Sequence, residues 1–289
     1  MMLLPASSNS TLSRSTHYAS TVARLAVRAL YAELTLYPKP GLVSLVDNGS
    51  HRDMDAATFM RSIFALRHYF RDITLAGARS VRFDQLVVLG IAAERRMMAA
   101  TGGINTHRGA VFALGMLCAS AGQMHARALP ASAEVLRSIL RECWGEALAR
   151  HAAHDVPLSN GRRAAQRYAV GGARDEAAFG FPSVFQVALP VMCATLGTGR
   201  GMVLARIDAL FALMASMDDT NILHRGGAAG AVLVRSAAQR FLAMGGTANP
   251  GWKAEALACH RSFTERSLSP GGAADLLAAA CLVWQLAVL

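Results

Sequence analysis

The sequence predicts an all-α protein, a single compact domain of about ten or eleven helices. Apolar residues recur at helical spacing from one end to the other, and no segment shows the two-residue alternation of a strand. The chain is 53% hydrophobic with much alanine, the residue that most favours helix. Its 289 residues can bury one large core, and no linker is long enough to divide it.

The first predicted helix runs from Thr16 to Tyr37 and ends where two prolines follow. Residues 1–15 are rich in serine and threonine and lack the apolar segment of a secretory signal. We therefore expect residues 1–15 to form a frayed leader before one all-helical domain over residues 16–289.

The later elements follow from the same apolar spacing and from breaks at glycine and proline. An irregular segment over 42–54 precedes a second helix near Asp55, and Asp84 is the expected N-cap of the third. Pro182 is expected to start a helix that kinks at Pro190. The expected ranges from the third helix onward are 83–100, 106–122, 131–154, a short helix over 162–169 within an irregular 157–181, then the helix from Pro182 and the ranges 202–221, 228–244, 252–268 and 270–288.

The formal net charge of +10 indicates an anionic partner. The arginines are scattered along helices, and no aromatic ladder suited to stacking bases is present, which favours a phosphorylated metabolite over nucleic acid. No apolar run is long enough to cross a bilayer. Five cysteines without a CxxC pair indicate reduced thiols, so we expect a cytoplasmic protein that binds neither nucleic acid nor membrane.

A polar segment, Thr101–Ala110, lies between two apolar helices. Its glycines allow a sharp turn, and Asn105 or Thr106 is expected to cap the next helix, whose free N–H groups form an anion seat. His107 and Arg108 fall in the first turn, where positive charge opposes the helix dipole. A bound phosphate would account for them, and a capped loop with a solvated arginine is an equal alternative.

A second polar segment follows the first helix. Lys39 stands between two prolines, which restrict its backbone and lower the entropic cost of aiming its charge. His51, Asp53 and Asp55 then approach the start of a helix. For Asp55 alone, an acidic N-cap in a surface turn is the favoured interpretation.

Two acids and an amide interrupt an apolar run near residue 220. On one continuous helix, Asp218, Asn221 and Arg225 would share a face, with Asp219 about 100° away. Neighbouring carboxylates with an amide suit magnesium, although adjacent acids also occur on helix surfaces without function. Because the run around them is apolar, we favour the metal site.

A further anion seat is expected where the last helix begins. Ser269 has the side chain of an N-cap and Pro270 suits the first helical position. Gly271 and Gly272 leave the following N–H groups uncovered, and Asp275 lies in the next turn.

The segment Gly171–Glu176 combines a glycine turn with neighbouring base and acid, including Arg174 and Asp175. Surface ion pairs have the same composition, so this segment alone does not decide between the two.

Five segments occur in a fixed order: PKPGLVSLVDNGSHRDMD, TGGINTHRG, GARDEAAFGFP, DDTNILHRGG and SPGGAADLL. Together they resemble the triphosphoribosyl-dephospho-coenzyme A synthases, which make the prosthetic-group precursor for the acyl carrier subunits of citrate lyase and malonate decarboxylase. The resemblance covers Tyr37 to Leu277. Two positions depart from the family pattern: Arg108 stands where lysine is usual, and Asp175 where glycine is usual.

The resemblance implies an all-α enzyme that takes ATP and 3′-dephospho-CoA, expels adenine, and joins the ribose C1 of ATP to the 2′-hydroxyl of the coenzyme. Cleaving the N-glycosidic bond produces an oxocarbenium-like sugar that a carboxylate can stabilise, and the attacking hydroxyl needs a base. On this basis Asp53 or Glu176 is the base or stabiliser, and Asp218 and Asp219 carry Mg²⁺. Phosphates are expected to bind Lys39, Arg108, Arg225 and the helix start at Ser269, Gly271 and Gly272, while Asn105 and His107 orient the nucleotide, and His51, Thr106, Arg174, Asn221 and Asp275 complete the substrate-binding set.

The same resemblance implies that the product passes to a phosphoribosyl-dephospho-CoA transferase and an acyl carrier protein. The alanine- and arginine-rich composition favours the malonate decarboxylase branch over the citrate lyase branch. The apolar end of the chain, 276–289, is either core or the face of a homodimer. Two alternatives remain, an ATP-dependent nucleotide hydrolase on the same scaffold and a non-enzymatic basic helical protein that binds nucleic acid.

Overall fold

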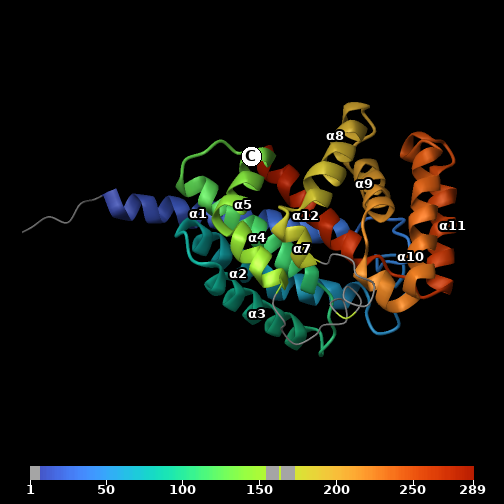
Figure 1. Cartoon of the computed structure of the whole chain (residues 1–289), viewed down its shortest axis with the longest axis horizontal. Coiled ribbons are helices and arrows are strands. Elements are labelled where there is room, and N and C mark those ends of the chain that lie inside the picture. The colour runs from blue at the N-terminus through green and yellow to red at the C-terminus, as the bar shows by residue number, and fades with distance from the viewer. Residues whose placement is uncertain (1–6, 154–162, 164–172) are drawn as a thin grey trace, which may run out of the picture.

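Every regular element in the described part of the chain is a helix (Figure 1). The computed structural model describes residues 7–153, 163 and 173–289, and within them eleven α-helices form one domain. The all-α prediction is confirmed. The elements are α1 (Ser7–Leu34), α2 (Ala56–Ala78), α3 (Phe83–Ala100), α4 (Arg108–Ala126), α5 (Ala133–Ala153), α7 (Ala173–Ala178), the π-helix η1 (Ser183–Ala188), α8 (Leu189–Gly197), α9 (Met202–Ser216), α10 (Thr220–Ala243), the 3-10 turn η2 (Gly246–Ala248), α11 (Trp252–Glu265) and α12 (Gly271–Ala287).

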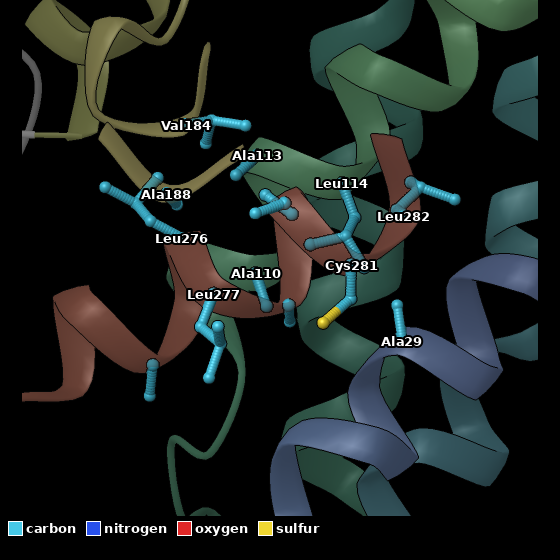
Figure 2. Close-up of a cluster of buried hydrophobic side chains, with 14 of the residues drawn as sticks. Ala29, Ala110, Ala113, Leu114, Val184, Ala188, Leu276, Leu277, Cys281 and Leu282 are labelled. Atoms are coloured by element: carbon cyan, nitrogen blue, oxygen red, sulfur yellow. The ribbon is translucent and has the colours of Figure 1, made fainter. Parts of the chain in front are cut away.

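Helices α4 and α12 form the centre of the core. Both are apolar around most of their circumference, which is the pattern of a helix covered on all sides. Figure 2 shows α4 and α12 side by side, with Leu114 near Cys281 and with Ala29 of α1 and Val184 of η1 around them. The apolar end of the chain is therefore largely core.

Glycines allow α2 and α4 to pack backbone to backbone. A Cβ on Gly77 would overlap the carbonyl of Ala119, and one on Gly122 would overlap the carbonyl of Thr74. These two helices thus approach more closely than larger side chains would permit.

Helix α1 begins at Ser7, nine residues before the predicted start at Thr16. No glycine or proline interrupts the chain from Ser7 to Tyr37, so helical backbone extends into the serine-rich stretch that we expected to be a leader. The helix ends at Leu34, ahead of the cis Tyr37–Pro38 bond.

Two other predicted boundaries differ in detail. Asp84 is not the N-cap of α3, because the helix starts at Phe83 and the carboxylate instead pairs with Arg82. Helix α4 continues to Ala126, past the expected end at Gly122. Of the short helix expected over 162–169, all but residue 163 lies outside the described residues.

Pro190 follows a wider helical turn. The N–H of Leu189 bonds to the carbonyl of Val184, five residues back, and the six residues of η1 have π-helical geometry. Since proline has no N–H to donate and crowds the preceding turn, a wide turn before Pro190 relieves that crowding. The predicted irregularity at this proline thus takes the form of a π-helix.

The expected helix over 202–221 is in fact two elements. Helix α9 ends at Ser216, and Met217 and Asp219 have extended backbone before α10 begins at Thr220. The break that we expected before residue 228 is a kink inside α10, at Gly227 with φ 60°. Among the described helices, none combines the length and apolarity that a membrane span requires.

Replacing Gly77 with alanine should push α2 and α4 apart, because the new Cβ would overlap the backbone of Ala119. We expect Gly77→Ala to lower the free energy of unfolding by about 2 kcal/mol in urea denaturation. The matched control is Gly197→Ala in α8, where a Cβ would meet nothing within 4 Å. Similar effects of the two substitutions would contradict this account of the packing.

Candidate active site

Three segments that are far apart in the chain meet around the His51 ring. Its Nε2 lies 2.8 Å from Ser269 Oγ, and Arg225 Nη2 lies 3.3 Å from its Nδ1. Because a guanidinium can only donate, Nδ1 accepts and Nε2–H donates to Ser269. Burial and the neighbouring Arg225 lower the pKa of His51 to about 4, so the ring is neutral at physiological pH. The side chain of Ser50 adds a bond of 2.5 Å to the carbonyl of Leu268.

The start of α12 holds a carboxylate of the protein itself. Asp219 is the N-cap of α10, where its Oδ1 accepts from the N–H of Asn221 at 2.9 Å. Its Oδ2 accepts from the N–H of Ala273 at 3.0 Å, at the opening turn of α12. A Cβ on Gly272 would lie 3.0 Å from the same oxygen. The anion seat expected here exists, but Asp219 occupies it.

This geometry corrects two expectations about the last helix. Ser269 does not cap α12, whose N-cap position is Pro270, and the serine hydroxyl contacts His51. The N–H groups near Gly271 and Gly272 are not uncovered either, since Gly271 N–H donates to the Ser269 carbonyl at 2.9 Å.

A second carboxylate lies at the start of α4. The Ala110 N–H donates to the carboxyl of Asp275, and a Cβ on Gly109 would overlap Asp275 Oδ2. Burial, then the charges of Glu33 and Asp219, raise the pKa of Asp275 well above its usual value. The seat predicted at the start of α4 is therefore also taken, and by a residue that we expected to bind substrate.

Lys39 is buried in an ion pair. Its Nζ lies 2.6 Å from Glu33 Oε1, and 1% of the lysine is exposed. Burial lowers the pKa of Lys39, while the adjacent Glu33 carboxylate opposes that shift. The Lys39 carbonyl lies 3.0 Å from His260 Nδ1, which fixes the backbone of the proline-flanked turn. The lysine thus has a protein carboxylate as its partner in this structure.

The N-cap position of α4 is His107 and not Asn105 or Thr106 as expected, although Asn105 Oδ1 accepts from the Arg108 N–H at 3.1 Å. The Arg108 Nε lies 3.1 Å from Glu94 Oε2, with about two fifths of the arginine side chain exposed. The arginine at this position is thus held by α3 while still reaching the surface.

His107 is buried beside α2. Its Nδ1 lies 2.7 Å from Ser62 Oγ, and its Nε2 has no hydrogen-bond partner, like Thr106 Oγ1 beside it. Burial is the main cause that lowers the pKa of His107 to about 3, and the charge of Lys39 adds to the shift. The ring is therefore a neutral hydrogen-bonding group.

Asp218 and Asp219 do not face a common point. Asp218 forms an ion pair with Arg235 further along α10, whereas Asp219 is buried at the start of α12. The argument that placed Asp218, Asn221 and Arg225 on one helix face is wrong, because Asp218 lies in the non-helical link between α9 and α10. The pair does not fit a magnesium site built on both carboxylates, and no cluster of three or more potential metal ligands is found among the described residues.

The two carboxylates expected to carry the chemistry lie in different surroundings. Asp53 is 62% exposed, with Oδ1 3.7 Å from His51 Nδ1, so it borders the junction described above. Glu176 accepts from the N–H and hydroxyl of Ser183 at the start of η1, and burial raises its pKa. Its neighbour Arg174 donates to the carbonyl of His151 at 3.2 Å.

Two buried polar residues outside the five segments belong to this arrangement, Glu33 and Ser62. Both stand on the apolar faces of their helices, Glu33 in line with Ala26 and Ala29 on α1 and Ser62 beside Leu66 on α2. A polar residue at a core position is a signal available in the sequence, but it does not name the partner.

Comparison with known proteins gives a consistent set of relatives. The model of the CitG family, described as ATP:dephospho-CoA triphosphoribosyl transferase, matches residues 19–289. A probable 2-(5''-triphosphoribosyl)-3'-dephosphocoenzyme-A synthase of Acinetobacter calcoaceticus is 41% identical over 253 residues, 88% of this chain and 86% of the relative. One of Vibrio cholerae is 38% identical over 98% of this chain and 93% of its own length, and a synthase of Pectobacterium atrosepticum is 39% identical over 89% and 85%. No solved structure matches this chain.

Removing the Asp219 carboxylate should destabilise the fold, because it would leave the buried N–H of Ala273 in α12 and the part-buried N–H of Asn221 in α10 without an acceptor. We expect Asp219→Ala to lower the free energy of unfolding by about 2 kcal/mol in urea denaturation. Asp218→Ala is the control, since it removes only a half-exposed ion pair and should cost less than about 1 kcal/mol. Equal losses at the two positions would contradict the assigned roles.

Asp275 should make stability depend on pH. A carboxyl with a raised pKa binds its proton more tightly in the folded than in the unfolded state, so its contribution is largest below the unfolded value of 3.8 and falls as pH rises toward the folded value. An amide at this position would carry no charge at any pH. We therefore expect Asp275→Asn to gain stability relative to the wild type as the pH rises above 3.8, measured by urea midpoints. A difference that is constant with pH would refute this.

Proposed function

The chain belongs to the ATP:dephospho-CoA triphosphoribosyl transferase family, and we propose that it transfers the triphosphoribosyl group of ATP to the 2′-hydroxyl of 3′-dephospho-CoA with release of adenine. The observation that carries this proposal is the junction at His51, which joins the segments around residues 51, 225 and 269. Those are three of the five segments through which the sequence resembles the family.

We assign phosphate binding to cations at the rim of this junction. Arg225 is exposed next to His51, and Arg108 keeps part of its guanidinium in solvent while Glu94 anchors it. Guanidinium groups suit phosphate because they offer several donors in one plane. The Asn221 amide lies beside Gly271, since a Cβ added to that glycine would lie 3.0 Å from Asn221 Nδ2. This amide supplies a further donor. Because Lys39 is buried and paired with Glu33, it affects the phosphates only by electrostatic interaction at a distance and does not contact them.

The proposed reaction exchanges one bond at the anomeric carbon. The bond from ribose C1 to adenine breaks with its electron pair on the base, and a bond from C1 to the coenzyme 2′-oxygen forms. The hydroxyl proton passes to a carboxylate, and the departing adenine takes up a proton. Asp53 and Glu176 are the candidates for that carboxylate. Asp53 is favoured by its position next to His51, and Glu176 by its partial burial and raised pKa.

We further propose that magnesium arrives with the nucleotide. Magnesium commonly reaches proteins through phosphate oxygens and retains several waters, so it needs few protein ligands. This agrees with the different partners of Asp218 and Asp219, and no step of the proposed reaction requires the two carboxylates to share an ion.

The finer assignment is to the malonate decarboxylase branch, in the cytoplasm. Its support is the alanine- and arginine-rich composition and the five free cysteines. On this proposal the product passes to a phosphoribosyl-dephospho-CoA transferase and then to an acyl carrier protein. A homodimer would have to use a face other than α12, since most of that helix is buried within the chain.

Free adenine is the product that distinguishes this reaction. We expect the purified protein, given ATP, magnesium and 3′-dephospho-CoA, to release adenine and triphosphoribosylated coenzyme in equal amounts, measured by liquid chromatography with mass detection. The control omits the coenzyme, and adenine or phosphate release that persists without it would favour the nucleotide hydrolase instead. Formation of ADP or AMP without adenine would reject the proposed chemistry.

A further inference from the structure

Two buried polar atoms without partners stand on consecutive residues at the start of α4. Thr106 Oγ1 and His107 Nε2 are both shielded from solvent and make no hydrogen bond, and the only other such atom in the described residues is Arg206 Nε on α9. Leaving a polar atom unpaired in the interior costs about 1–3 kcal/mol. Two of them on neighbouring side chains indicate a place built to contact something else.

The tautomer of His107 follows from its single side-chain contact. The Ser62 hydroxyl lies 2.7 Å from Nδ1, and His107 is its one hydrogen-bond partner among the described residues. If Nδ1–H donated to Ser62, the buried hydroxyl proton would have no acceptor. With the hydroxyl donating, Nδ1 accepts and Nε2 carries the ring proton. The unpaired atom is therefore an N–H donor.

The ring around this donor is held on several sides. The Phe59 ring packs edge-on against the His107 ring at a centroid distance of 4.9 Å. The backbone nitrogen of His107 lies 3.3 Å from Met97 Sδ. Ser62 is fully buried and 3% of His107 is exposed. The donor is thus already oriented, and only the residues that shield Nε2 from solvent have to move for an acceptor to reach it.

We propose that Ser62 is a positioning residue which holds His107 in its Nε2–H form, and that this N–H donates to an acceptor atom of a bound adenine nucleotide. The Thr106 hydroxyl is the neighbouring contact to the same ligand. This inference rests on the proposed function for the identity of the ligand. A ring nitrogen and a phosphate or ribose oxygen offer the same acceptor chemistry, and both substrates of the proposed reaction carry them.

Nitrogen NMR of protein labelled with ¹⁵N-histidine tests the inference without turnover. We expect the His107 ring of the wild type to show a protonated Nε2 and an unprotonated Nδ1, and its Nε2 resonance to shift when nucleotide is added. ATP and 3′-dephospho-CoA are titrated separately, so that the one causing the shift identifies the acceptor. A protonated Nδ1, or no shift with either nucleotide, would overturn the proposal.

Variants separate positioning from a merely structural role. Ser62→Ala should lose the tautomer preference and raise the KM of the nucleotide identified by NMR about tenfold, with the KM of the other substrate within about twofold. His107→Gln, whose amide can place a donor near the Nε2 position, should retain most of the affinity that His107→Leu loses. Equal affinities of the glutamine and leucine variants would contradict the donor role.

Thermal unfolding of each variant checks that the fold is kept, and the NMR result on the wild type stands even if Ser62→Ala unfolds. The two proposals also fail separately. Absence of adenine release by the wild type would reject the proposed reaction, whereas adenine release together with an unshifted Nε2 resonance would reject only the role of His107.

Discussion

This site depends on the hydrogen bonds that aspartate carboxyl groups accept from N–H groups at the starts of helices. Asp219 caps α10 and also accepts from the first turn of α12, and Asp275 of α12 faces the first turn of α4. Each carboxylate satisfies N–H groups that a helix leaves unpaired and meets the positive end of its dipole. The three helices are thereby joined in series, and their starts, which carry the segments shared with the family, are brought to one region of the molecule.

The same arrangement concentrates charge in a poorly solvated interior. Glu33 and Asp219 both raise the pKa of Asp275, while the Lys39 ammonium next to Glu33 lowers the pKa of His107. Charges interact more strongly where water is excluded, so these groups influence one another across the cluster. As a result, His51 and His107 are neutral, and Asp275 keeps its proton to a higher pH than an ordinary aspartate. Such groups are suited to hydrogen bonding with a nucleotide.

The sequence predicted helices far better than it predicted the partners of polar residues. Apolar spacing placed α3 at its observed bounds, but the same spacing continues through Met217 and hid the break before α10. Glycines indicated anion seats at the starts of α4 and α12, but the predicted capping residues are not the N-caps of these helices. Local sequence does not reveal that carboxylates from elsewhere in the chain occupy them, nor that Glu33 meets Lys39. The activity was recognisable through the resemblance of five ordered segments, and not through the geometry of any one of them.

The contact between Gly109 and Asp275 has an evolutionary consequence. Because the carboxyl occupies the space that any side chain at residue 109 would need, the fate of a substitution at one position is conditional on the residue at the other. A larger residue at 109 is tolerable only after residue 275 has become smaller, and that change removes the acceptor facing Ala110. Residues 109 and 275 should therefore be substituted together during evolution or both be retained, even though they lie far apart in the sequence.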